Sequence, residues 1–110
     1  MKLMATLNAL DRLKKAANLE PIKKQVTLSD GSTFEMFVTP LTMAERERAQ
    51  KQARSDDSNA FALQLLINKA LDANGTKLFN PGEIDVLKNE VKDSDLQSLM
   101  LAVINAEEEE

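Results

Sequence analysis

The sequence predicts an α+β fold that is mostly helical, with one N-terminal β-hairpin packed with about four to five helices. Apolar and polar residues alternate on both sides of a Ser29-Asp30-Gly31-Ser32 turn signal, which is typical of a hairpin. Elsewhere apolar residues recur at helical spacing between capping and stop signals. With 110 residues, the chain has the length of one small domain. We divide it into an amphipathic helix over 1–20, a hairpin and helical domain over 22–106, and an acidic flexible tail over 107–110.

The opening segment, residues 1–20, has the pattern of an amphipathic helix. Pro21 ends it, because the residue before a proline is disfavoured in the helical region. Core packing is the structural interpretation of its apolar face, and an arm that binds a neighbouring molecule is the functional one. The residues that share this face are Leu3, Leu7, Leu10, Leu13 and Ala17.

The hairpin pattern also predicts its own loop. A two-residue Asp30-Gly31 turn would mix apolar and polar side chains on each face, whereas a three-residue loop pairs Val26 with Phe34 and gathers one apolar face. We therefore expect a type I turn with Gly31 in the left-handed region. Phe37 falls on the other face. Because an isolated hairpin is marginal in water, this one must pack on helices or gain strands from another subunit. The apolar face comprises Ile22, Val26, Leu28, Phe34, Met36 and Val38.

A polar helix is predicted over 43–54. Thr42 and Glu45 have the spacing of a capping box, in which each side chain binds a free backbone N–H of the other residue. We interpret this helix as solvated. Its basic residues alternate with acidic ones, so they are a weak signal for nucleic-acid binding. These residues are Arg46, Arg48, Lys51 and Arg54.

Three further helices are expected. Asp57 or Ser58 caps a helix over 59–73 that is apolar nearly all round and belongs at the centre of the fold, with Asn74-Gly75 as its stop. Asn80-Pro81-Gly82-Glu83 opens the next helix, whose inner residues are Ile84, Leu87 and Val91. The last helix is capped around Asp93 or Ser94, and its apolar positions are Leu96, Leu99, Met100, Val103 and Ile104.

The composition argues against catalysis. The chain has no Cys and no His, which removes disulfides, thiolate or imidazole zinc sites and nucleophilic or acid–base mechanisms based on those residues. The segment from Asp72 departs from a calcium loop, since Lys77 stands where that loop requires Gly. No Gly-rich phosphate loop or nucleophile elbow occurs. We therefore expect a protein that is not an enzyme and has no catalytic residues, cofactor or metal site.

Charge is distributed unevenly along the chain. Residues 1–54 carry ten Lys and Arg against six Asp and Glu, a net charge of +4, whereas residues 55–110 carry four against twelve, a net charge of −8. Head-to-tail association, or partners of opposite charge at the two ends, would follow from such polarity. Chance variation in a small protein is the alternative. No apolar segment is long enough to span a membrane, and no secretory signal is recognisable.

The order of the segments resembles the tail assembly chaperones of long-tailed bacteriophages. The resemblance lies in the strand, Asp30-Gly31-Ser32 turn, second strand and Leu41-Thr42-Met43-Ala44-Glu45-Arg46. It continues through Leu71–Asn80 and the helix after it, and covers about 22–104. The long helix before the hairpin departs from many members of that family.

The resemblance implies a protein of the infected bacterial host's cytoplasm that is absent from the finished virion. It would bind the tape measure protein, keep it soluble and help recruit tail tube subunits. Many family members also have a frameshift-extended form. We expect a homo-oligomer without membrane contact and with no nucleic-acid partner. The expected partner-binding residues, on the arm or the hairpin, are Leu3, Leu7, Leu10, Val26, Phe34, Met36 and Phe37.

Two alternatives stay open from the sequence alone. The first is a small phage structural or adaptor protein of the tail or head–tail joint, which would remain in the virion. The second is a small regulator that binds nucleic acid through the basic residues of 43–54, with an affinity that falls steeply as salt is raised.

Overall fold

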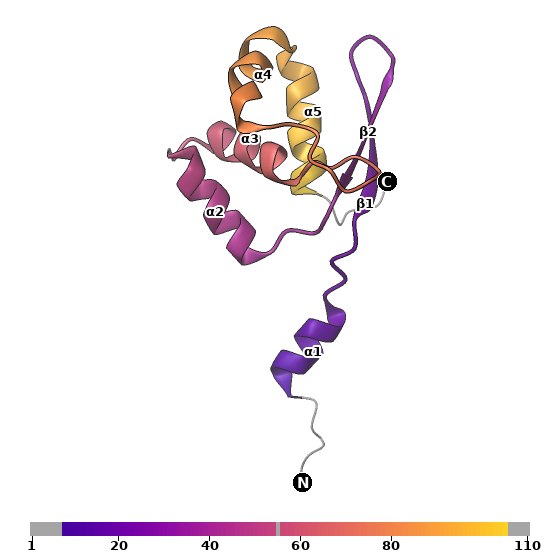
Figure 1. Ribbon diagram of the computed structural model, residues 1–110, viewed down its shortest axis with the longest axis vertical. Helices are drawn as coiled ribbons and strands as arrows, with labels where there is room; N and C mark the ends of the chain where they lie inside the picture. The colour runs from indigo at the N-terminus through magenta and orange to yellow at the C-terminus, as the bar shows by residue number, and fades with distance from the viewer. Residues whose placement is uncertain (1–7, 55, 106–110) are drawn as a thin grey trace.

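In the computed structural model, which describes residues 8–54 and 56–105, one hairpin stands beside a group of helices (Figure 1). The predicted α+β, mostly helical fold is confirmed. In chain order the elements are α1 (Ala9–Ala16), β1 (Ile22–Thr27), β2 (Thr33–Val38), α2 (Met43–Ala53), α3 (Ser58–Lys69), α4 (Ile84–Glu90) and α5 (Asp93–Ile104). A single turn of 3-10 helix, Pro81–Glu83, leads directly into α4.

The hairpin has the predicted register and loop. β1 and β2 are antiparallel, and Val26 lies opposite Phe34. The Leu28 N–H donates to the Ser32 carbonyl at 2.8 Å, and the Gly31 N–H donates to the Leu28 carbonyl at 2.9 Å. Gly31 has a φ of 89°, the left-handed conformation that glycine adopts without steric cost. The three-residue loop with Gly31 in the left-handed region is therefore confirmed.

The segment after α3 differs from the prediction. The expected helix over 59–73 ends at Lys69, and Leu71 then pairs with the outer edge of β2 through two 2.8 Å hydrogen bonds with Phe37. Asp72 starts a second tight turn, because its carboxylate accepts from the N–H groups of Asn74 and Thr76. Gly75 lies in that turn and has a φ of 83°. The prediction that it ends the helix is therefore wrong. Pairing with a strand edge outweighed helix propensity here.

The core lies between the hairpin and α3 and α5. The prediction that the apolar helix is central is confirmed, since Leu65, Leu66 and Ile67 are at most 1% exposed. In α5, Leu96, Leu99, Met100 and Val103 are buried as expected. Two parts of the prediction for α5 are wrong. Its N-cap is Lys92, which makes no side-chain cap hydrogen bond, and Ile104 is exposed at the end of the helix.

Two lysines are buried with hydrogen-bond acceptors. Lys24 lies on the apolar face of β1, and its Nζ donates to the carbonyl of Asn105 at the C-terminus of α5, 3.1 Å away. A cation is favourable there because the helix dipole is negative at that end. Lys69 donates to Glu45 Oε1 at 2.7 Å and to Thr39 Oγ1 at 2.9 Å. This pair joins α3 to the start of α2.

The predicted capping box of α2 is confirmed, and Glu45 completes it. Its carboxylate accepts from the Thr42 N–H at 3.0 Å, and the Thr42 hydroxyl accepts from the Glu45 N–H at 3.2 Å. Partial burial opposes ionisation of Glu45, but the hydrogen bonds from Lys69 and Thr42 outweigh it and hold its pKa below the ordinary value. One carboxylate therefore fixes both the start of α2 and the charge of a buried lysine.

Candidate partner-binding surfaces

The hairpin face that we expected to bind a partner is mostly covered by the chain itself. Val26 is 8% exposed and Met36 is fully buried, and both belong to the hydrophobic core. α5 packs against β1, and the hairpin loop is tied to it because Asp95 accepts two 2.8 Å hydrogen bonds from Ser29. Val26 and Met36, which we expected to bind a partner, therefore present little surface to one. A hairpin face that complements the helices of its own chain needs no second subunit.

Phe34 remains at the margin of the core. It is half-buried, and its ring stacks on that of Phe79 with a centroid distance of 6.3 Å and an angle of 6° between the planes. Phe79 comes from the segment before α4, so the stack joins the hairpin to the second half of the chain. Phe79 lies in the Leu71–Asn80 segment that carries the family resemblance, but it was not among the predicted partner-binding residues. An aromatic residue between Gly75 and Asn80, in a segment otherwise rich in turn residues, was the available signal.

Phe37 lies on the opposite face of the hairpin. Its backbone pairs with Leu71, and its cross-strand neighbour is Lys23. Lys23 Nζ lies 3.1 Å from the Glu35 carboxylate on this face. The hydrogen bonds from Lys23 and Gln25 hold the pKa of Glu35 below its ordinary value. Charged and polar side chains thus surround Phe37, which makes this face a weaker candidate for hydrophobic docking.

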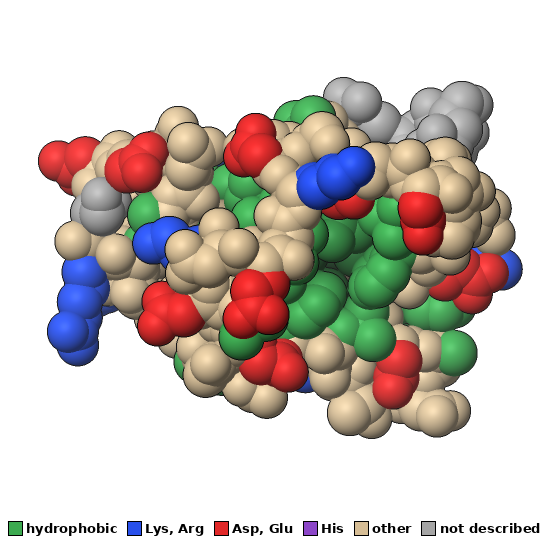
Figure 2. Space-filling model, turned by 90° about the horizontal axis from the view of Figure 1, so that it is seen from above, with side chains coloured by type: hydrophobic (Ala, Val, Ile, Leu, Met, Phe, Trp, Pro, Cys, Tyr) green, Lys and Arg blue, Asp and Glu red, His purple; other side chains and the backbone are tan. Residues whose placement is uncertain are grey.

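Half-buried hydrophobic side chains lie along the margin of the core. Figure 2 shows hydrophobic side chains gathered in a hollow at the end of the molecule, and the charged side chains around it are mostly Asp and Glu. An apolar surface with a polar rim is the usual anatomy of a protein interface. The margin comprises Leu28, Phe34, Leu41, Phe61, Leu78, Phe79, Ile84, Val91 and Ala102.

The arm predicted over 1–20 is a helix only over Ala9–Ala16 within the described residues. Leu3 and Leu7 lie outside the described residues. Leu10 is 62% exposed and Leu13 is 69% exposed, and no residue of α1 is buried. In Figure 1, α1 stands away from the other elements. The radius of gyration of 16.6 Å exceeds the roughly 13 Å expected for a compact domain of this length.

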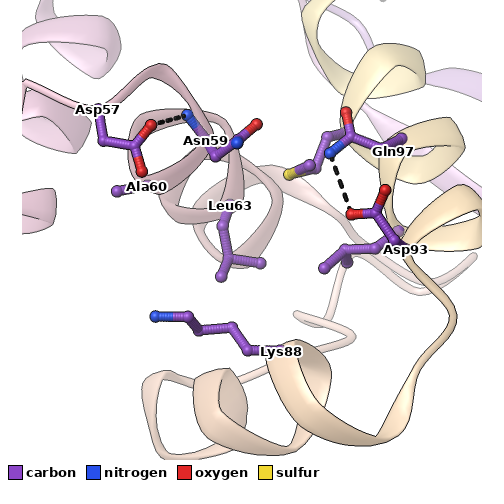
Figure 3. A pocket seen from close by; sticks show the side chains of 9 residues that line it. Asp57, Asn59, Ala60, Leu63, Lys88, Asp93 and Gln97 are labelled. Atoms are coloured by element: carbon purple, nitrogen blue, oxygen red, sulfur yellow. Dashed lines mark hydrogen bonds between the residues drawn. The ribbon is translucent and has the colours of Figure 1, made fainter.

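A groove of about 220 Å³ opens between α3, α4 and α5 (Figure 3). We call it the α3–α5 groove. Lys88 of α4 reaches toward it from below in that view, and Asp57 and Asp93 stand on its two sides. Asp57 caps α3 by accepting from the Asn59 N–H at 3.1 Å. The lining residues are Asp57, Asn59, Ala60, Leu63, Lys88, Asp93, Leu96, Gln97 and Met100.

The helical spacing of Leu96 and Met100 predicts that both lie in the core, but the sequence does not predict this groove. The two residues are 8% and 3% exposed. A groove arises where neighbouring helices diverge, and the sequence carries no signal of the angle between α3 and α5. Its volume is below the roughly 300–1,000 Å³ of most small-molecule sites, so a side chain of another protein suits it better than a cofactor.

Among residues 8–54 and 56–105, no three His, Cys, Asp or Glu side chains are grouped so that they could hold a metal ion. In the same part of the chain, no helix is long and apolar enough to cross a membrane. Comparison with protein-family models, with curated proteins and with solved structures gave no match.

Proposed function

We propose that this protein is a tail assembly chaperone of a long-tailed bacteriophage. It binds the tape measure protein, keeps that protein soluble and helps recruit tail tube subunits in the host cytoplasm, without becoming part of the virion. The resemblance over about 22–104 suggests this function. The observation in the structure that supports it best is the apolar hollow at one end of the molecule, surrounded mainly by acidic side chains (Figure 2).

The proposed client needs its apolar surface covered. A long helical protein with apolar stripes aggregates through those stripes unless another surface covers them. The half-buried Phe34 and Phe79 offer aromatic area that is already ordered by their stacking, so little side-chain entropy is lost when a client helix packs on them. The acidic side chains around the apolar hollow in Figure 2 favour helices with basic flanks and disfavour acidic ones.

Co-production with the candidate client tests this proposal. The chain is produced with a long, helix-rich tape measure protein of the bacteriophage that encodes it, and the soluble fraction of that protein is measured. We expect the wild-type chain to keep the client soluble and Phe34→Ser to lose most of this effect. Met43→Ser is the matched control, because Met43 is 65% exposed on α2. Circular dichroism establishes that both variants are folded.

The structural or adaptor alternative makes a different prediction. Mass spectrometry of purified virions should detect an adaptor in stoichiometric amounts, whereas a chaperone should be missing. Detection of the chain in virions would therefore contradict the proposal. The genome gives an independent test, because a reading frame that overlaps the end of this gene would indicate a frameshift-extended form.

A further inference from the structure

The starting observation is an amphipathic helix whose apolar face is uncovered. Leu10 and Leu13 are three residues apart on α1, so they lie on one face, and both are more than 60% exposed. An isolated helix of eight residues is marginal in water, because helix formation has a costly nucleus that few hydrogen bonds offset. Cover for the two leucines would stabilise α1 by removing their side chains from water.

The charge of α1 indicates the kind of surface that would provide this cover. The helix has a net charge of +2, because it contains three basic residues and one acidic residue. These are Arg12, Lys14, Lys15 and Asp11. Residues 56–105 carry four Lys and Arg and eight Asp and Glu, a net charge of −4. The α3–α5 groove belongs to that acidic half. Leu63, Leu96 and Met100 contribute apolar atoms to its lining. Asp57 and Asp93 flank it, and Lys88 is the one cation among the described residues that reaches toward it (Figure 3).

We infer that α1 of one molecule docks in the α3–α5 groove of a second copy of this chain. Leu10 and Leu13 would pack toward Leu63, Leu96 and Met100, which line the groove. The basic side chains of α1 would lie near Asp57 and Asp93. The inference does not depend on the proposed function, since it rests on two surfaces of this chain alone.

Docking within the same molecule is disfavoured by the position of α1. The five residues between α1 and β1 let the end of α1 lie at most about 22 Å from the start of β1. In Figure 1, α1 lies at one end of the 61 Å long molecule, whereas the turn between α4 and α5 lies at the other. Each molecule therefore offers its arm at one end and its groove near the other, and the contact is head-to-tail. Such a contact builds an open chain unless its rotation closes a ring.

The first test is the mass of the full chain in solution over a range of concentrations. We expect multiples of 12.2 kDa that grow with concentration, and a return to the monomer mass for the double variant Leu10→Ser/Leu13→Ser. Loss of two buried leucines should weaken association at least about a hundredfold. Met43→Ser, the control at an exposed hydrophobic residue of α2, should associate like the wild type. A monomeric wild type, or an unchanged assembly of the double variant, would overturn the inference.

Charge reversal tests which surfaces meet. Lys14→Glu/Lys15→Glu makes α1 acidic, and Asp93→Lys/Gln97→Lys makes the groove basic. Each variant alone should associate more weakly than the wild type. An equimolar mixture should recover assembly, because each arm then finds a groove of opposite charge on the other variant. Failure of the mixture to associate, with both variants folded by circular dichroism, would contradict the contact.

Cross-linking distinguishes docking between copies from docking within one chain. The sequence has no cysteine, so an introduced pair reports a single contact. A mixture of the Leu13→Cys and Gln97→Cys chains should give a disulfide-linked heterodimer under mild oxidation, and a mixture of Met43→Cys and Gln97→Cys should not. Linkage within the chain of the double variant Leu13→Cys/Gln97→Cys, at the monomer mass, would show that the arm docks in its own groove and would overturn the inference.

Discussion

Removal of the charge on Glu45 should cost far more stability than removal of its partner Lys69. The Lys69 side chain is 2% exposed, so without an ionised acceptor its ammonium group stays buried and unpaired. The Glu45 side chain is 33% exposed and keeps its hydrogen bond from the Thr42 N–H, so it can be hydrated when Lys69 is replaced. The two partners of one ion pair are therefore unequal.

The variants separate charge from capping. Glu45→Gln retains an oxygen that can complete the capping box, and it should cost about 2–3 kcal/mol, the value of a hydrogen bond to a buried charge. Lys69→Met removes the buried charge and keeps much of the side-chain volume, so its cost should stay below about 1 kcal/mol. The double variant Glu45→Gln/Lys69→Met should recover most of the loss caused by Glu45→Gln alone.

Urea denaturation followed by circular dichroism measures these differences. For a domain whose total stability is about 5–15 kcal/mol, a loss of 2–3 kcal/mol moves the midpoint clearly. Similar costs for Glu45→Gln and Lys69→Met would refute the argument, because they would mean that both charges are equally hydrated. Additive costs in the double variant would mean that the pair does not interact.

Three other predictions concern the pKa of Glu45, the backbone conformation of Gly31 and the burial of Leu66. Because hydrogen bonds keep the pKa of Glu45 lower in the folded than in the unfolded chain, its stabilisation is present above the ordinary pKa of 4.5 and is lost as pH falls through the folded value. Unfolding free energies measured from pH 6 to about pH 3 should thus fall less steeply for Glu45→Gln than for the wild type. Gly31→Ala should cost about 1–2 kcal/mol in urea denaturation, since Gly31 has a φ of 89° while no atom lies within 4 Å of the added methyl group, and Gly31→Asn should cost less. Leu66→Ala should cost about 2–5 kcal/mol by the same assay, whereas Leu101→Ala, at a 55% exposed position, should change stability by less than about 0.5 kcal/mol.

The hairpin could be predicted in detail because its information is local. Parity alone distinguished a two-residue from a three-residue loop, and the structure has the register that pairs Val26 with Phe34. The capping box of Thr42 and Glu45 was readable for the same reason, since both partners lie within one helical turn. In such segments, side-chain chemistry and backbone geometry depend on residues that are adjacent in the chain.

Long-range pairing was not readable from the sequence. The segment after Lys69 continues an apolar pattern typical of a helix, but Leu71 pairs with Phe37, a residue 34 positions earlier. What covers the apolar face of the hairpin also depends on residues that are distant in the chain. Parity indicated that Met36 would be covered, but only the packing of α5 on β1 showed that the cover comes from the same chain.

The candidate surfaces were predicted in part. The exposure of Leu10 agrees with an arm that does not pack in its own core, whereas the α3–α5 groove depends on the angle between helices and had no sequence signal. Phe79 was missed because a single aromatic residue in a turn-rich segment has no periodicity to reveal its partner.

The soluble yield of the tape measure protein tests the central claim most directly. The proposed client, a long, helix-rich tape measure protein, is produced alone, with the wild-type chain, and with folded Phe34→Ser or Met43→Ser variants. We predict that the client is soluble with the wild type and with Met43→Ser, and mostly insoluble alone or with Phe34→Ser. A client that stays insoluble in the presence of the folded wild-type chain would contradict the chaperone function.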